Sequence, residues 1–149
     1  MSVRTSKNAE LFFKALEDVW VAEQTWYGSP NNAVWHCTQA TEKTLKGILR
    51  CFNIEFEHGH ELEILLESVL SVFEVSKETS ENVLFLDKYR LSLRYRNTSS
   101  DPTPEDARRA ISRAKQIMQE FNKNSSVAQF MDEAREVHAK MLKENSKVT

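Results

Sequence analysis

Five polar side chains recur at helical spacing between positions 36 and 50, and they are the first candidates for binding chemistry. They are separated by three, four, three and four residues: His36, Gln39, Lys43, Lys46 and Arg50. At 3.6 residues per turn, such positions lie along one line on a helix surface. One imidazole, one amide and three cations in a line suit a phosphate-bearing ligand. An ordinary solvated polar face has the same pattern, so spacing alone leaves both interpretations open.

A second group of cations lies about forty residues further along the chain. Its cations are Arg90, Arg94 and Arg96, and Tyr95 and Asn97 lie among them. Arg90 and Arg94 are four residues apart, so like charges share one helix face at a cost of a few tenths of a kcal/mol. Guanidinium groups match phosphate geometry well. The group therefore predicts an anionic ligand or acidic partner nearby, or glutamates from a neighbouring helix.

Other reactive residues carry weaker signals. His58 and His60 begin a metal-binding spacing that no cysteine or carboxylate cluster completes, so we expect no metal and no cofactor. Cys37 lies on an apolar stripe and is typical of a small core residue. The sequence has no Gly-rich phosphate loop, and its scattered carboxylates form no acid–base pair.

Helical periodicity runs through the whole sequence and predicts the elements that must position these residues. The expected helices span about 6–26, 30–52, 62–73, 83–93, 104–121 and 126–141. Thr103 is predicted to cap the fifth helix, with Pro104 at its first position, and Ser126 with Gln129 to form a capping box on the sixth. Serines and charged residues around 76–80 suggest a loop. Short connections predict an all-α, up-and-down antiparallel bundle of four to five helices plus an additional C-terminal helix.

Composition agrees with a single helical domain. A chain of 149 residues with only three glycines and three prolines has few of the turns that barrels and sandwiches require. No run approaches the roughly 18 apolar residues of a membrane span, and the N-terminus lacks the apolar run of a secretory signal. Two cysteines without such a signal predict free thiols and a cytoplasmic protein.

Charge is distributed unevenly although the net charge is only −2. Residues 53–87 contain nine acidic side chains and one lysine, a net −8, whereas residues 88–115 contain eight basic and three acidic side chains, a net +5. Opposite helix faces that attract one another, or a basic region facing an anionic ligand, would each explain this distribution.

Four sequence pieces, in order, resemble the HEPN domain family. They are Trp35-His36-Cys37-Thr38-Gln39-Ala40-Thr41-Glu42-Lys43-Thr44-Leu45-Lys46, then Gly59-His60-Glu61-Leu62, then Tyr89 with Leu93-Arg94-Tyr95, and last the Ala-rich segment 105–117. The resemblance covers residues 8–121, so we expect a HEPN-like bundle there and a C-terminal helix over 122–149 that packs on the bundle or on a dimer partner. Members are small helical bundles, commonly homodimers.

The resemblance also implies a choice between binding and cleavage. Many HEPN proteins are partners of a minimal nucleotidyltransferase, often as toxin–antitoxin pairs; some bind nucleotides, and others are metal-independent ribonucleases. The ribonuclease motif is an arginine, a polar residue, spacers and a histidine. Here Arg96 and Asn97 fit, but Asp101 stands near the histidine position. An exposed aspartate is ionised near pH 7, so it cannot protonate a leaving oxygen.

The leading hypothesis is therefore a non-catalytic, homodimeric HEPN-type protein that binds a nucleotide, a minimal nucleotidyltransferase, or both. Its phosphate contacts would come from the row on residues 36–50 and from Arg90, Arg94 and Arg96. Phe130, Met131 and Met141 are expected at the dimer face. The alternatives are a ribonuclease with a degenerate motif, for which RNA would be the ligand, and a purely structural interaction module. RNA is the less favoured ligand, and no membrane association is expected.

Overall fold

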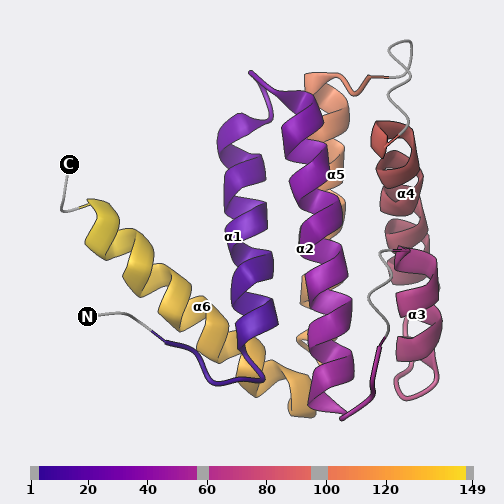
Figure 1. Ribbon diagram of the computed structural model, residues 1–149, viewed down its shortest axis with the longest axis vertical. Coiled ribbons are helices and arrows are strands. Elements are labelled where there is room, and N and C mark those ends of the chain that lie inside the picture. Colours follow the sequence, from indigo (N-terminus) through magenta and orange to yellow (C-terminus); the bar gives the residue numbers. More distant parts are fainter. Residues whose placement is uncertain (1–3, 57–60, 95–100, 147–149) are drawn as a thin grey trace.

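The computed structural model describes residues 4–56, 61–94 and 101–146, with the backbone alone for 91–94, and these segments form six helices and no strand. The helices are α1 (Glu10–Thr25), α2 (Pro30–Cys51), α3 (Leu62–Leu70), α4 (Lys77–Arg94), α5 (Pro104–Phe121) and α6 (Ser125–Ser146). α1, α2, α4 and α5 run side by side, α3 lies beside α4, and α6 leaves the bundle at an angle (Figure 1). The predicted all-α bundle with an additional C-terminal helix is confirmed.

α1 and α2 form an antiparallel hairpin with the most extensive contact in the molecule. Gly47, near the C-terminal end of α2, lies against the ring of the fully buried Phe12 of α1. A Cβ at position 47 would lie 2.7 Å from Cε1 of Phe12. Glycine therefore lets the two helices approach closely at this crossing.

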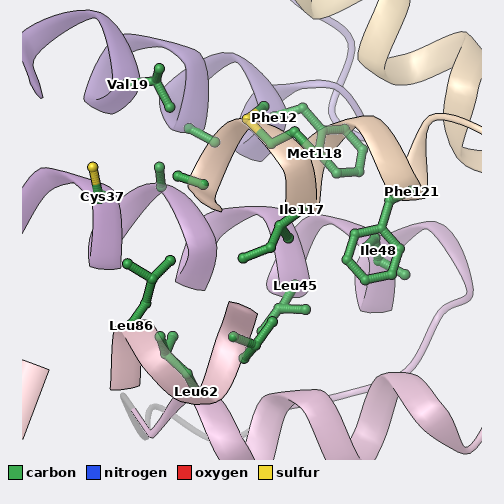
Figure 2. Close-up of a cluster of buried hydrophobic side chains, with 14 of the residues drawn as sticks. Phe12, Val19, Cys37, Leu45, Ile48, Leu62, Leu86, Ile117, Met118 and Phe121 are labelled. Atoms are coloured by element: carbon green, nitrogen blue, oxygen red, sulfur yellow. The ribbon is translucent and has the colours of Figure 1, made fainter. Parts of the chain in front are cut away.

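The core lies where α2 meets the other bundle helices. Phe12 and Val19 of α1, Leu45 and Ile48 of α2, and Ile117 and Phe121 of α5 converge there (Figure 2). Leu62 of α3 and Leu86 of α4 close the opposite side, and both are fully buried. Cys37 is also fully buried among these side chains, as its place on the apolar stripe predicted. Burial raises the pKa of its thiol to about 12, with smaller contributions from the negative charges of Asp18 and Glu23.

Two helix boundaries differ from the sequence prediction on the α3–α4 side. α3 ends at Leu70 rather than at Phe73, and α4 begins at Lys77, within the stretch predicted as a loop. The hydroxyl of Ser76 accepts a hydrogen bond from the backbone N–H of Thr79 at 3.1 Å. Ser76 is thus an N-cap, so the polar residues that follow it form the exposed first turn of a helix.

The start of α5 is as predicted and is reinforced by a reciprocal pair of hydrogen bonds. The Thr103 hydroxyl accepts from the N–H of Asp106 at 3.1 Å, and the Asp106 carboxylate accepts from the N–H of Thr103 at 2.9 Å. The hydrogen bond from the backbone N–H of Thr103 lowers the pKa of the Asp106 carboxyl. α5 therefore begins at a fixed position directly after the segment that carries Asp101.

α6 begins one residue earlier than predicted, and its cap is a different residue. The side-chain oxygen of Asn124 accepts from the N–H of Ser126 at 2.8 Å, so the predicted Ser126–Gln129 capping box is replaced by an asparagine cap. The buried residues of α6 are Val127, Met131 and Ala134, all in its first half, and the helix packs against α1. Met131, expected at a dimer face, is thus already buried within its own chain, while Phe130 and Met141 remain half-buried.

None of the helices in the described segments is long and apolar enough to cross a bilayer.

Candidate functional site

The polar row on α2 faces α1, and a single carboxylate joins two of its members. Asp18 of α1 accepts from Nδ1 of His36 at 2.8 Å through one oxygen and from Nζ of Lys43 at 2.5 Å through the other. The Asp18 side chain is 10% exposed, against 30% for His36 and 27% for Lys43. The hydrogen bond to Asp18 fixes the orientation of the imidazole toward α1.

The remaining cations of the row also have partners in the bundle. Lys46 pairs with the buried Glu42 at 3.5 Å and lies 5.6 Å from the centroid of the Phe56 ring. Nη1 of Arg50 donates to the backbone oxygen of Lys7 at 3.3 Å and lies 3.9 Å from Glu10. Each cation of the row therefore has a carboxylate within 4 Å. Gln39 is half-buried on the same side of α2.

Arg90 is not on the surface. It is 5% exposed, and its Nε donates to the carboxylate of Asp87 at 2.8 Å. The same Asp87 oxygen accepts from the backbone N–H of Leu62, the first residue of α3, at 3.3 Å. Arg90 and Asp87 thus attach the start of α3 to α4.

The second group of candidates is only partly within the described residues. α4 ends at Arg94, whose side chain lies outside the description, as do Arg96 and Asn97. The His58–His60 pair lies outside it as well. Asp101 is described and is exposed, three residues before the N-terminus of α5.

The two histidines in the described segments both contact residues of α1. His36 is bonded to Asp18 of α1. His138 of α6 meets the Phe13 ring edge-on, with centroids 5.9 Å apart, and burial lowers its pKa against a smaller opposing effect of Glu17. The same segments contain no cluster of histidine, cysteine and carboxylate groups suited to a metal ion.

The structure shows a further polar cluster that sequence reasoning missed, between α4 and α5. We call it the α4–α5 seam; it consists of Asn82, Phe85, Tyr89, Arg109 and Arg113. The guanidinium of Arg113 lies 3.8 Å from the centroid of the Phe85 ring, and its Nη1 donates to the Asn82 side-chain oxygen at 2.9 Å. Aromatic residues four apart on α4 and arginines four apart on α5 were the sequence signal for it.

The comparisons with known proteins identify the family. The family model of the HEPN domain matches residues 7–124, and the chain belongs to this family. TT1696 from Thermus thermophilus has a similar crystal structure, with a TM-score of 0.66 and 21% identity over 86% of this chain and 98% of that one. ST0689, an archaeal HEPN homologue, has a TM-score of 0.63 and 22% identity over 85% of this chain and 99% of that one. No curated protein matches the sequence. These structural similarities establish the fold.

Proposed function

We propose that this chain is a non-catalytic HEPN-domain protein that binds a nucleotide and does not cleave RNA. The observation that carries the proposal is the position of His36. Since the motif histidine is replaced, the imidazole of His36 would be the first alternative proton donor for the Arg96–Asn97 segment. This imidazole is hydrogen-bonded to Asp18 of α1. The residue near the expected histidine position is the exposed Asp101.

The chemistry of RNA cleavage explains why this matters. Metal-independent cleavage needs a base for the 2′-hydroxyl proton and an acid for the leaving oxygen, with cations to balance the phosphorane. Asp101 can act only as a base, and its charge repels phosphate. General acid–base assistance contributes about 10²- to 10⁴-fold, so the lack of an imidazole lowers activity by that order.

Binding needs no proton transfer, only cations that are not already neutralised. In the α2 row, Lys43, Lys46 and Arg50 each lie beside a carboxylate, which favours a structural role for that row. Arg94 and Arg96 remain the phosphate contacts expected from the sequence. A minimal nucleotidyltransferase partner and a homodimer are further predictions that belong to the same proposal.

Titration calorimetry with ATP, ADP, AMP and GTP tests the binding. We expect at least one nucleotide to bind with an affinity that falls as salt rises, because phosphate contacts are screened. The Arg94→Ala/Arg96→Ala variant should weaken this binding by about 10-fold or more if each contact contributes about 1 kcal/mol. Lys123→Ala, a charge change at an exposed site near the opposite end of α5, is the control. No heat with any of the four nucleotides at millimolar concentration would contradict the proposal.

An RNA-cleavage assay in EDTA tests the second half of the proposal. The wild type should leave a mixed-sequence RNA intact, and Asp101→His should gain cleavage if the site lacks only its acid. Rapid cleavage by the wild type that Arg96→Ala abolishes would instead support the ribonuclease alternative.

A further inference from the structure

The cations of the α2 row differ from two arginines of α5 in what they contact. Those of the α2 row each lie beside a carboxylate. Arg113 and Arg109 of α5 form no ion pair with a carboxylate within the described segments. Because an anion binds best where positive charge is not already balanced, the α4–α5 seam is better suited to an anion than the α2 row.

Arg113 is held in place by neutral groups alone. One face of its guanidinium stacks on Phe85, and Nη1 is bonded to the amide oxygen of Asn82. Asn82 is itself 4% exposed, and its amide nitrogen donates to Gln116 of α5 at 3.2 Å. The guanidinium is therefore oriented without being neutralised. An arginine has five N–H donors, so Nη2 and Nε remain able to bind an anion.

Arg109 extends the positive charge by one helical turn toward the start of α5. It is exposed, and it lies close enough to Tyr89 and Asp106 to affect the pKa of both. Tyr89 meets Phe85 edge-on with centroids 5.2 Å apart, and burial, with the negative charge of Asp106, raises the pKa of its hydroxyl. Asp106 is an acidic residue beside the seam, and its carboxylate accepts a hydrogen bond from the Thr103 N–H. The two positive charges of Arg109 and Arg113 exceed the single negative charge of Asp106.

The seam lies on the same helix as the predicted phosphate contact Arg94. Tyr89 and Phe85 are five and nine residues before that residue on α4, so the seam extends from the end of α4 down the bundle. An oriented guanidinium with a second cation beside aromatic rings suits the phosphate ester of a nucleoside, in which the rings contact the base and the guanidinium groups contact the phosphate.

We infer that the α4–α5 seam is a binding site for the phosphate ester of a nucleotide, with Arg113 and Arg109 as phosphate contacts in addition to those predicted from the sequence at the end of α4. The inference rests on the proposed function and names a site for it. A mononucleotide and an RNA strand present the same phosphate chemistry, and the experiment has an arm for each.

The test measures binding of ATP by calorimetry and of a short unstructured oligoadenylate by fluorescence anisotropy, with wild type, Arg109→Ala/Arg113→Ala and Lys123→Ala. Lys123 is exposed, so Lys123→Ala changes the charge near the other end of α5. Arg113→Lys keeps the charge but lacks the planar group that stacks on Phe85. Circular dichroism melting of each variant shows that the fold is retained.

We expect the double variant to bind at least one of the two ligands about 10-fold or more weakly, and Lys123→Ala to bind within about twofold of wild type. Arg113→Lys should fall between them. Wild-type binding of ATP that persists in the double variant overturns the inference and leaves the proposed function standing. Binding of oligoadenylate alone, lost in the double variant, supports the seam and replaces the nucleotide of the proposed function by RNA. Binding of neither ligand overturns both.

Discussion

The ring of Phe12 on α1 fills the space in which a Cβ at Gly47 of α2 would lie. That Cβ would be 2.7 Å from Cε1 and 3.0 Å from Cζ of Phe12. The ring is fully buried and cannot swing away. The approach of α1 to α2 therefore depends on the lack of a side chain at position 47.

Gly47→Ala should accordingly destabilise the protein. Overpacking a core costs about 1–3 kcal/mol, against a gain of roughly 1 kcal/mol from the better helix propensity of alanine. Urea unfolding measures the difference. Phe12→Leu in the Gly47→Ala background should recover part of the loss, and Gly28→Ala, where a new Cβ meets nothing within 4 Å, should not destabilise. Equal stability of Gly47→Ala and wild type would show that α1 shifts freely.

Asp18→Asn tests whether the α2 row is structural. The change leaves the Lys43 ammonium, 27% exposed, without its carboxylate, and hydrogen bonds to charged groups contribute about 1.5–3 kcal/mol each. We expect a loss of about 2 kcal/mol in the free energy of unfolding. Glu10→Gln affects a carboxylate that is 47% exposed and should cost less than about 1 kcal/mol. A double-mutant cycle with Asp18→Asn and Lys43→Met measures the coupling energy between these two residues. Additive effects of the two substitutions would argue against such a coupling.

Arg90→Ala should be among the most destabilising substitutions outside the apolar core. It leaves the carboxylate of Asp87 buried without its cation, and breaking a buried pair costs about 3–5 kcal/mol. Thermal unfolding followed by circular dichroism measures the expected fall in melting temperature. If Arg90 is instead a ligand contact, Arg90→Lys will weaken nucleotide binding while the melting temperature stays at the wild-type value.

Cys37 should resist thiol reagents in the folded protein. With a pKa of about 12, only about 10⁻⁴ of its thiol is ionised at pH 8, and the side chain is fully buried. Cys51 is half-buried; burial raises its pKa too, and the positive charge of Arg50 opposes that effect. Mass spectrometry after iodoacetamide treatment should find one fast label, on Cys51, and two labels in denaturant. Cys51→Ser should abolish the fast label. Rapid labelling of Cys37 would mean that α1 and α2 separate readily.

Because the ring of His138 lies between α6 and α1, we expect its contribution to the stability of the protein to depend on pH. Burial lowers its pKa in the folded state, so the unfolded chain takes up the proton first as pH falls. The contribution of the neutral His138 ring to the free energy of unfolding is complete above the pKa of about 6.5 in the unfolded chain. It is lost as the pH falls toward the lower pKa of the folded protein. Urea unfolding of wild type and His138→Gln between pH 7.5 and 5 should show a stability difference that changes with pH in this direction. A difference independent of pH would contradict the assignment.

Sequence periodicity predicted the helices well where an apolar stripe met a clear stop signal. The stripe of α2 ends at Asn53, whose φ of 57° lies in the left-handed region, and α5 begins at the predicted Thr103 cap. The prediction was wrong where the first turn of a helix carries no apolar residue, as at Lys77. The hydroxyl of Ser76, three residues before Thr79, was the available signal there.

The candidate site was harder to predict because charges act between helices. The row on α2 is a property of one helix, and spacing places its members correctly. Two of its carboxylate partners, Asp18 and Glu10, lie on α1, and pairing them with the row requires the register of the two helices. The same holds for Arg113, whose contacts with Phe85 and Asn82 bring together residues about thirty positions apart.

The divergence of α6 from the bundle makes its two halves unequal in their protection from hydrogen–deuterium exchange. Val127, Met131 and Ala134 are buried, whereas the later apolar residues of the described part of the helix are at most half-buried. Opening the last turns of α6 (Figure 1) exposes little new apolar surface, so their amide protons should exchange by local fraying. Amides near Met131 should exchange only when larger parts of the fold open. Within this one helix, the exchange of amide protons should therefore change from local opening near its C-terminal end to cooperative unfolding near Met131.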